Sequence, residues 1–323
     1  MLGALYALLS AATFGFNTAS ARRGMVSATV FQGLAVTVPM GVPLFAAFAL
    51  ATGELVTVTE FSTLGYVYLA CAGIVHFVWG RYCAYRSVKA MGGNLSAPVQ
   101  NANLVVALGL AILVLDEHLT PLKIVGLALI VIGPVIAVPT RRKKTAAAPA
   151  SGAPAFQPKL LEGYTWAIMS ATGYGLSPVL VRLGLEGTHG ASFAGGLISY
   201  SAATLFFGLF LIPRGRLTHV LSVERRALPW FVNSGFFVFL AQMFRYLALS
   251  IAPVTVVSPV QRLSGIFRII FTTILNRDYE VINSRLVIGT LISILGAITL
   301  TMSVDVVAVH LPLPRAFLEW SWP

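Results

Sequence analysis

The chain has 323 residues, of which 57% are hydrophobic and only 10% are charged, and its mean hydropathy is +0.84. An average soluble domain is roughly 25% charged, so this composition excludes an ordinary soluble protein. The net charge of +11 would suggest a nucleic-acid partner in a soluble chain, but here the basic residues lie mostly in loops beside apolar stretches, where they indicate membrane orientation.

Apolar stretches near the length that a membrane-crossing helix needs recur along almost the whole chain. We therefore predict an all-α membrane protein with ten transmembrane helices, five in each half. The first stretch has no basic region before it, so we predict a helix of the mature protein rather than a cleavable signal peptide. The predicted spans are 2–21, 30–51, 63–85, 94–115 and 122–139, then 161–181, 193–212, 228–250, 255–275 and 286–303.

The two halves of the chain repeat each other. Because five spans per half is an odd number, the second copy must enter the membrane from the opposite side, which predicts an inverted repeat. The expected domains are a first repeat at 1–140, a basic then Ala/Pro-rich linker at 141–158, a second repeat at 159–303 and an interfacial tail at 304–323. The matching positions include Ser10 and Ser170, Arg22 and Arg182, Arg81-Tyr82 and Arg245-Tyr246, and Pro98-Val99-Gln100 and Pro259-Val260-Gln261.

The basic residues predict which way the chain crosses the membrane. Fifteen of the 22 Lys and Arg residues fall on the face of the linker, and three fall on the other face. Positive charge accumulates on the cytoplasmic side, so we expect a cytoplasmic linker and outer termini, in the inner (plasma) membrane of a prokaryote.

Two segments carry a resemblance to a known family. One runs from Met91 to Pro98 and is followed by an apolar helix that ends at Leu115-Asp116-Glu117; the other is the last helix of that copy, with Gly126 and Gly133. With the repeat of five spans in each half, this resembles the EamA-like branch of the drug/metabolite transporter superfamily over about 2–303. The resemblance implies a transporter with a central cavity lined by spans 1, 3, 4, 6, 8 and 9. It implies little about substrate, because the superfamily handles amino acids, nucleotide sugars, sugar phosphates and cations.

That resemblance places a glutamate at the end of the fourth span, and Glu117 fits. The second copy departs from the pattern at Asn276 to Glu280.

Arginines inside the predicted spans are the first candidates for a binding site. Arg262 and Arg268 fall in 255–275, which contains no carboxylate, and six residues at 100° each place them about 120° apart around one helix. Arg81 and Arg245 occupy matching places near opposite membrane faces. A guanidinium holds a carboxylate or phosphate with paired donors. Solvated arginines in a wide vestibule, or side chains that reach the headgroups, are the alternatives.

Polar and aromatic residues in the same spans complete the candidate substrate-binding set. Amides can bind substrate or join neighbouring helices, and His76 can be a buried structural histidine or a proton carrier. The candidates are Gln100, Gln261, Asn101, Gln242, His76, Trp79, Tyr82 and Tyr246.

The predicted function is a secondary transporter or exchanger of a small anionic or zwitterionic metabolite that works by alternating access. No carboxylate lies in the interior of a predicted span, which favours exchange or facilitated diffusion over a carboxylate proton relay. No metal-ligand spacing and no Walker loop occurs, so we expect no cofactor and no ATP. The alternative is a flippase for a phosphate-bearing lipid-linked headgroup. An enzyme is disfavoured, because the histidines are scattered along the chain and form no catalytic pair or metal cluster. The expected partners are membrane lipids and, besides the substrate, a second copy of the chain in a homodimer.

Overall fold

The computed structural model describes residues 1–24, 27–91, 99–100, 102–137, 159–188, 191–213 and 215–275, with a few isolated residues between 288 and 320. All regular elements in these ranges are helices. The described part therefore has the all-α architecture expected from the sequence. Five described segments are long and apolar enough to cross a membrane: Leu2–Ala21, Val30–Ala51, Thr63–Ser87, Ser192–Leu209 and Leu228–Ile251.

Two of the predicted spans in the first half are built from several pieces. The span at 30–51 breaks around Pro39, whose missing N–H weakens a continuous helix. The span at 63–85 continues to Met91 and contains a π-helical stretch, a wide turn that is frequent at functional sites. The elements are α1 (Leu2–Gly24), α2 (Val30–Thr37), α3 (Gly41–Ala51), η1 (Val56–Glu60), α4 (Thr63–Gly73), η2 (Ile74–Gly80), α5 (Arg81–Met91), α7 (Asn103–Leu115) and α8 (Pro121–Ala137).

The second half contains one important departure from the sequence prediction. The span at 255–275 is not one helix, because it is interrupted between Gln261 and Ser264. The angle of 120° between Arg262 and Arg268 assumed an unbroken helix, and it stays a prediction because the side chain of Arg268 lies outside the described residues. The elements are α9 (Leu160–Gly184), α10 (Ser192–Leu209), α11 (Arg216–Leu221), α12 (Leu228–Ile251), α13 (Val254–Gln261) and α14 (Ser264–Leu275).

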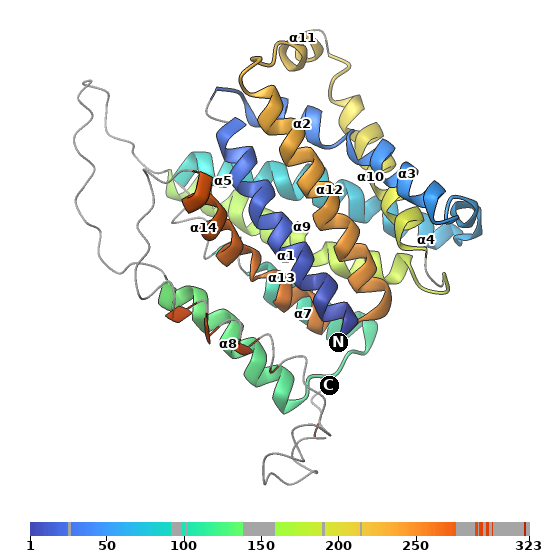
Figure 1. Cartoon of the computed structure of the whole chain (residues 1–323), viewed down its shortest axis with the longest axis vertical. Coiled ribbons are helices and arrows are strands. Elements are labelled where there is room, and N and C mark those ends of the chain that lie inside the picture. Colours follow the sequence, from blue (N-terminus) through green and yellow to red (C-terminus); the bar gives the residue numbers. More distant parts are fainter. Residues whose placement is uncertain are drawn as a thin grey trace, which may run out of the picture.

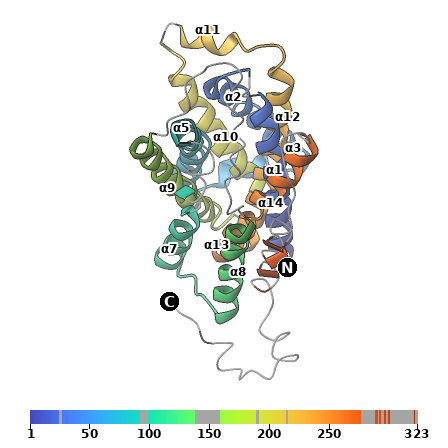
Figure 2. The same ribbon diagram turned by 90° about the vertical axis from the view of Figure 1, so that its left-hand side faces the viewer.

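The first helix of each half packs against the third and fourth helices of the other half. Helix α1 lies against α12, α13 and α14, and α9 lies against α4, η2, α5 and α7 (Figures 1 and 2). Matching serines make matching contacts: Ser10 donates to the Ala241 carbonyl at 2.7 Å, and Ser170 donates to the Gly80 carbonyl at 3.1 Å. The two halves thus interlock.

Small residues allow these helices to approach closely. An added Cβ at Gly175 of α9 would lie 2.5 Å from the Cβ of Val106 on α7, and one at Gly73 would lie 2.0 Å from the Ser199 carbonyl oxygen. Close contact at small residues is a main source of helix association in lipid. Larger residues there would push the halves apart.

Two carboxylates tie the halves together at helix N-termini. Both oxygens of Glu117 are used: Val254 N donates to one at 2.7 Å and Thr255 N to the other at 2.8 Å, at the start of α13. Glu54 accepts from the backbone N–H groups at the start of α10 through one oxygen, at 2.6 and 3.1 Å. Free N–H groups and the helix dipole both favour an anion at this position.

Candidate functional site

Arg245 is at the centre of a buried polar cluster. Its side chain is only 2% exposed, and it lies in the C-terminal part of α12, which ends at Ile251. One terminal nitrogen, Nη2, donates to Ser177 Oγ on α9 at 2.9 Å, and the other, Nη1, donates to Gln242 Oε1 at 3.0 Å. The same Nη1 lies 3.3 Å from Nδ1 of His76, in the π-helical stretch η2. Three elements from both halves therefore meet at one guanidinium.

The Arg245 cluster has too few hydrogen-bond acceptors. The Gln242 amide nitrogen lies 3.2 Å from His76 Nε2, while His76 Nδ1 faces Arg245. Both neighbours of the imidazole are donors, yet a neutral imidazole accepts at only one nitrogen. Exchanging the amide oxygen and nitrogen of Gln242 only moves the donor–donor contact to Arg245. An additional acceptor oxygen would remove the conflict.

Arg81 forms a second polar cluster, where η2 passes into α5. Its side chain is 8% exposed and donates to Thr37 Oγ1 of α2 at 3.3 Å. Asn17 of α1 and Ser234 of α12, which share a hydrogen bond of 2.5 Å, line a small cavity with it. The cavity measures about 10 Å³, room for about one water molecule. In this conformation the cavity beside Arg81 is closed to a larger ligand.

Arg262 occupies the interruption between α13 and α14. Its Nη1 donates to Asn103 Oδ1 of α7 at 2.7 Å, and its Nε is buried with no partner among the described residues. The preceding residue, Gln261, donates to Ser10 Oγ of α1 at 2.8 Å. The interruption is a short turn whose backbone stays hydrogen-bonded, because the Arg262 N–H donates to the Pro259 carbonyl at 2.9 Å and the Leu263 N–H donates to the Val260 carbonyl at 3.1 Å.

No carboxylate neutralises these three arginines within the described ranges. The ion pair found there joins Arg86 to Glu162 at 2.9 Å, away from the three clusters. Neither Arg81 nor Arg245 reaches out of the protein, so headgroup contact does not account for them. An uncompensated buried cation is costly, and a bound anion would lower that cost.

The other predicted site residues are distributed more widely. Gln100 donates to the Ala84 carbonyl at 3.2 Å, and Tyr82 packs edge-on against Trp166. Tyr246 is buried in the core, whereas Trp79 is 42% exposed and lies outside the clusters. Asn101 and the side chain of Arg268 lie outside the described residues.

Ser177 was not among the sequence candidates, although it contacts Arg245. A signal for it exists in the repeat, because the offset of 160 residues that relates Ser10 to Ser170 also relates Asn17 to Ser177. Arg182, in contrast, donates to the carbonyls of Leu249 and Ser250 at 2.7 and 3.1 Å. It binds the C-terminal turn of α12, a structural contact.

Comparisons with known proteins agree with this architecture. The model of the EamA-like transporter family matches twice, at residues 1–138 and 161–302. A solved crystal structure is similar over 93% of this chain and 95% of its own, with a TM-score of 0.70 and 17% sequence identity, which indicates a shared fold. A search of curated proteins finds no match.

Proposed function

Because the chain belongs to the EamA-like transporter family, as an integral multi-pass membrane protein, we propose that it moves a small anionic or zwitterionic metabolite across the membrane. The observation that carries this proposal is the cluster of buried arginines without carboxylate partners among the described residues. An anion bound among them supplies both the missing charge and the missing acceptor.

The Arg245 cluster is the proposed core of the anion site. Arg245 already presents donors toward Ser177 and Gln242, and a carboxylate or phosphate oxygen would accept from the donors that now oppose each other around His76. Arg262 and Arg81 lie on neighbouring elements and provide further positive charge. The aromatic ring of Tyr174, 4.9 Å from that of His76, offers an apolar wall for the rest of the metabolite.

Transport in this proposal proceeds by alternating access between two inverted repeats. The interlocked helices support it, because movement of one half against the other must change the surroundings of η2 and of the α13–α14 interruption. In this proposal the small cavity at Arg81 belongs to an occluded conformation. The basic linker is proposed to face the cytoplasm. Exchange of one anion for another is the proposed mode, since the sequence places no carboxylate in the interior of a predicted span.

A ligand panel on the purified full-length protein tests the proposal. Phosphates, carboxylates, sulfonates, amino acids and nucleotides are compared by the shift that each causes in the thermal unfolding midpoint, because a specific ligand stabilises the folded state. We expect an anion or zwitterion to stabilise the protein, and Arg245→Gln to abolish that shift. Arg216→Gln, at an exposed arginine of α11, is the matched control and should retain it.

Two results would contradict the proposal: stabilisation by cations alone, or an undiminished anion response in Arg245→Gln. The second candidate, a flippase for a lipid-linked phosphate, is separated by the same panel. It requires stabilisation by lipid-linked phosphates and none by their water-soluble headgroups.

A further inference from the structure

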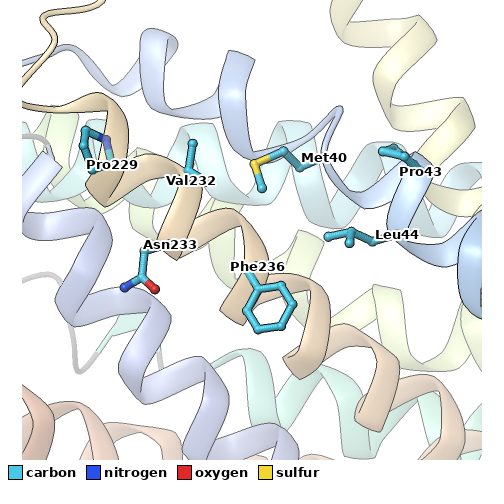
Figure 3. Close-up of a pocket in the computed structure, with 7 residues that line it drawn as sticks. All are labelled: Met40, Pro43, Leu44, Pro229, Val232, Asn233 and Phe236. Atoms are coloured by element: carbon cyan, nitrogen blue, oxygen red, sulfur yellow. The ribbon is translucent and has the colours of Figure 1, made fainter.

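An apolar groove of about 580 Å³ runs along the outside of the bundle, between α12 and the bend that joins α2 to α3. Met40, Pro43 and Leu44 form one wall (Figure 3). The bend creates this wall, because the helix is interrupted around Pro39 and resumes in a new direction at Gly41. At its base Met40 lies directly on α12, where a Cβ at Gly235 would be 2.5 Å from the Met40 sulfur.

The opposite wall is one face of α12. Pro229, Val232, Asn233 and Phe236 recur at helical spacing and line the groove, although the Asn233 amide points away from Met40 (Figure 3). Val232 and Phe236 remain 45% and 43% exposed. Asn233 is the polar exception, but its amide donates to Ser20 Oγ of α1 at 3.0 Å and is thus partly used within the protein. The groove therefore offers a nearly apolar surface.

The groove lies between two segments of membrane-spanning length. Both walls belong to segments long and apolar enough to cross a membrane, Val30–Ala51 and Leu228–Ile251. Seven residues separate Pro229 from Phe236, which is about 10 Å along the helix axis. This length suits the upper part of an acyl chain that begins at the membrane surface near the start of α12.

Positively charged residues lie next to the start of α12, where the groove-lining face of that helix begins. Arg225 and Arg226 are exposed in the turn before α12 and precede Pro229 by four and three residues. The Leu228 N–H donates to the Glu224 carbonyl at 3.2 Å, a helical bond, so these arginines share the side of α12 on which Pro229 lies. Arg23, from the end of α1, lies over the Trp230 ring with its Cζ 4.8 Å from the centroid. Glu224 is the one acidic side chain in this turn, so cations predominate.

We propose that this groove binds one anionic bilayer phospholipid, with an acyl chain between α12 and the α2–α3 bend and the phosphate among Arg23, Arg225 and Arg226. A polybasic surface beside the bilayer attracts anionic headgroups, and the adjoining groove adds a site for one chain. A second copy of the protein is a poor occupant, because a contact through this face would bring like-charged arginine clusters together. The bound lipid also braces the bend of α2–α3, which carries Thr37, the partner of Arg81.

Native mass spectrometry of the detergent-purified full chain tests the proposal. It is titrated with dioleoylphosphatidylglycerol, which is anionic, and with dioleoylphosphatidylcholine, which is not. We expect one tightly bound phosphatidylglycerol per chain and weaker phosphatidylcholine. Arg225→Gln with Arg226→Gln should weaken phosphatidylglycerol binding about 30-fold, because each interfacial arginine contributes roughly fivefold. Val232→Trp should block part of the groove and weaken both lipids by about tenfold or more, because each methylene group that loses its contact weakens binding roughly fourfold.

Matched controls separate this site from general lipid contact. Lys159→Gln removes an exposed cation at the start of α9, and Leu205→Trp enlarges an exposed apolar side chain of α10; neither should change binding. Equal affinity for the two lipids, or equal effects of Val232→Trp and Leu205→Trp, would overturn the proposal. The proposal would also be overturned if the groove variants changed the fraction of dimer without changing the amount of bound lipid, since the groove would then be a contact between two copies of the protein.

Discussion

Replacing Gln242 by glutamate should imitate a bound anion at Arg245. The substitution keeps the shape of the side chain and turns its amide into a carboxylate 3.0 Å from Arg245 Nη1 and 3.2 Å from His76 Nε2. Both contacts then become donor-to-acceptor, with His76 carrying its proton on Nε2 and accepting from Arg245 at Nδ1. The donor–donor conflict disappears.

The size of this effect follows from the geometry. Charge centres about 4 Å apart attract by roughly 4 kcal/mol at an effective dielectric constant of about 20. Desolvation of the new carboxylate removes part of this gain, but the site already holds an uncompensated cation, so we expect a net stabilisation of about 1–2 kcal/mol. Gln242→Met is the matched control: it removes an acceptor from Arg245 and should destabilise the protein by about 1–3 kcal/mol.

The two variants are compared by thermal unfolding in detergent and by ligand binding. Gln242→Glu should unfold at a higher temperature than the wild type and Gln242→Met at a lower one. The anion that stabilises the wild type should bind Gln242→Glu about a hundredfold more weakly, because a like charge now occupies its place. The reasoning is refuted if Gln242→Glu is less stable than Gln242→Met, or if it binds the anion as the wild type does.

Three further predictions concern other parts of the chain. Arg262→Ala and Arg268→Ala should each abolish uptake of the stabilising anion into proteoliposomes while the protein still folds; normal uptake by both variants would contradict an anion site in this span. Glu117→Gln should lower stability by about 1–3 kcal/mol, measured by thermal unfolding, because its amide nitrogen cannot accept the second backbone N–H. Glu54→Gln is its control and should be tolerated, because one oxygen of Glu54 accepts both backbone hydrogen bonds. Burial raises the pKa of the Glu54 carboxyl, against the lowering effect of the two backbone N–H groups, so loss of its charge costs little. Equal losses of stability in Glu117→Gln and Glu54→Gln would refute the distinction. A reporter fused within 141–158 should report cytoplasm, and a periplasmic signal would reverse the predicted topology.

The sequence alone determined that the chain is a duplicated, helical membrane protein. Its apolar stretches had the length that the bilayer demands, and no tertiary information is needed for that match. The repeat was visible because matching residues such as Ser10 and Ser170 stayed in place, and the structure gives both the same kind of contact. Arginines in the predicted spans were identified as candidates because the free energy needed to hold a charged side chain inside a membrane is high, and the sequence shows which spans contain them.

Only the tertiary structure decided which candidates meet. Periodicity could not show that the span at 255–275 is interrupted at Arg262, since the apolar pattern continues through the break, nor that 63–91 contains a π-helical turn at His76. The cluster of Arg245, His76, Gln242 and Ser177 joins residues as far apart as 169 positions in the sequence. Its shortage of acceptors is a property of that spatial arrangement, because hydrogen-bond donors conflict only when the fold brings them within reach of each other.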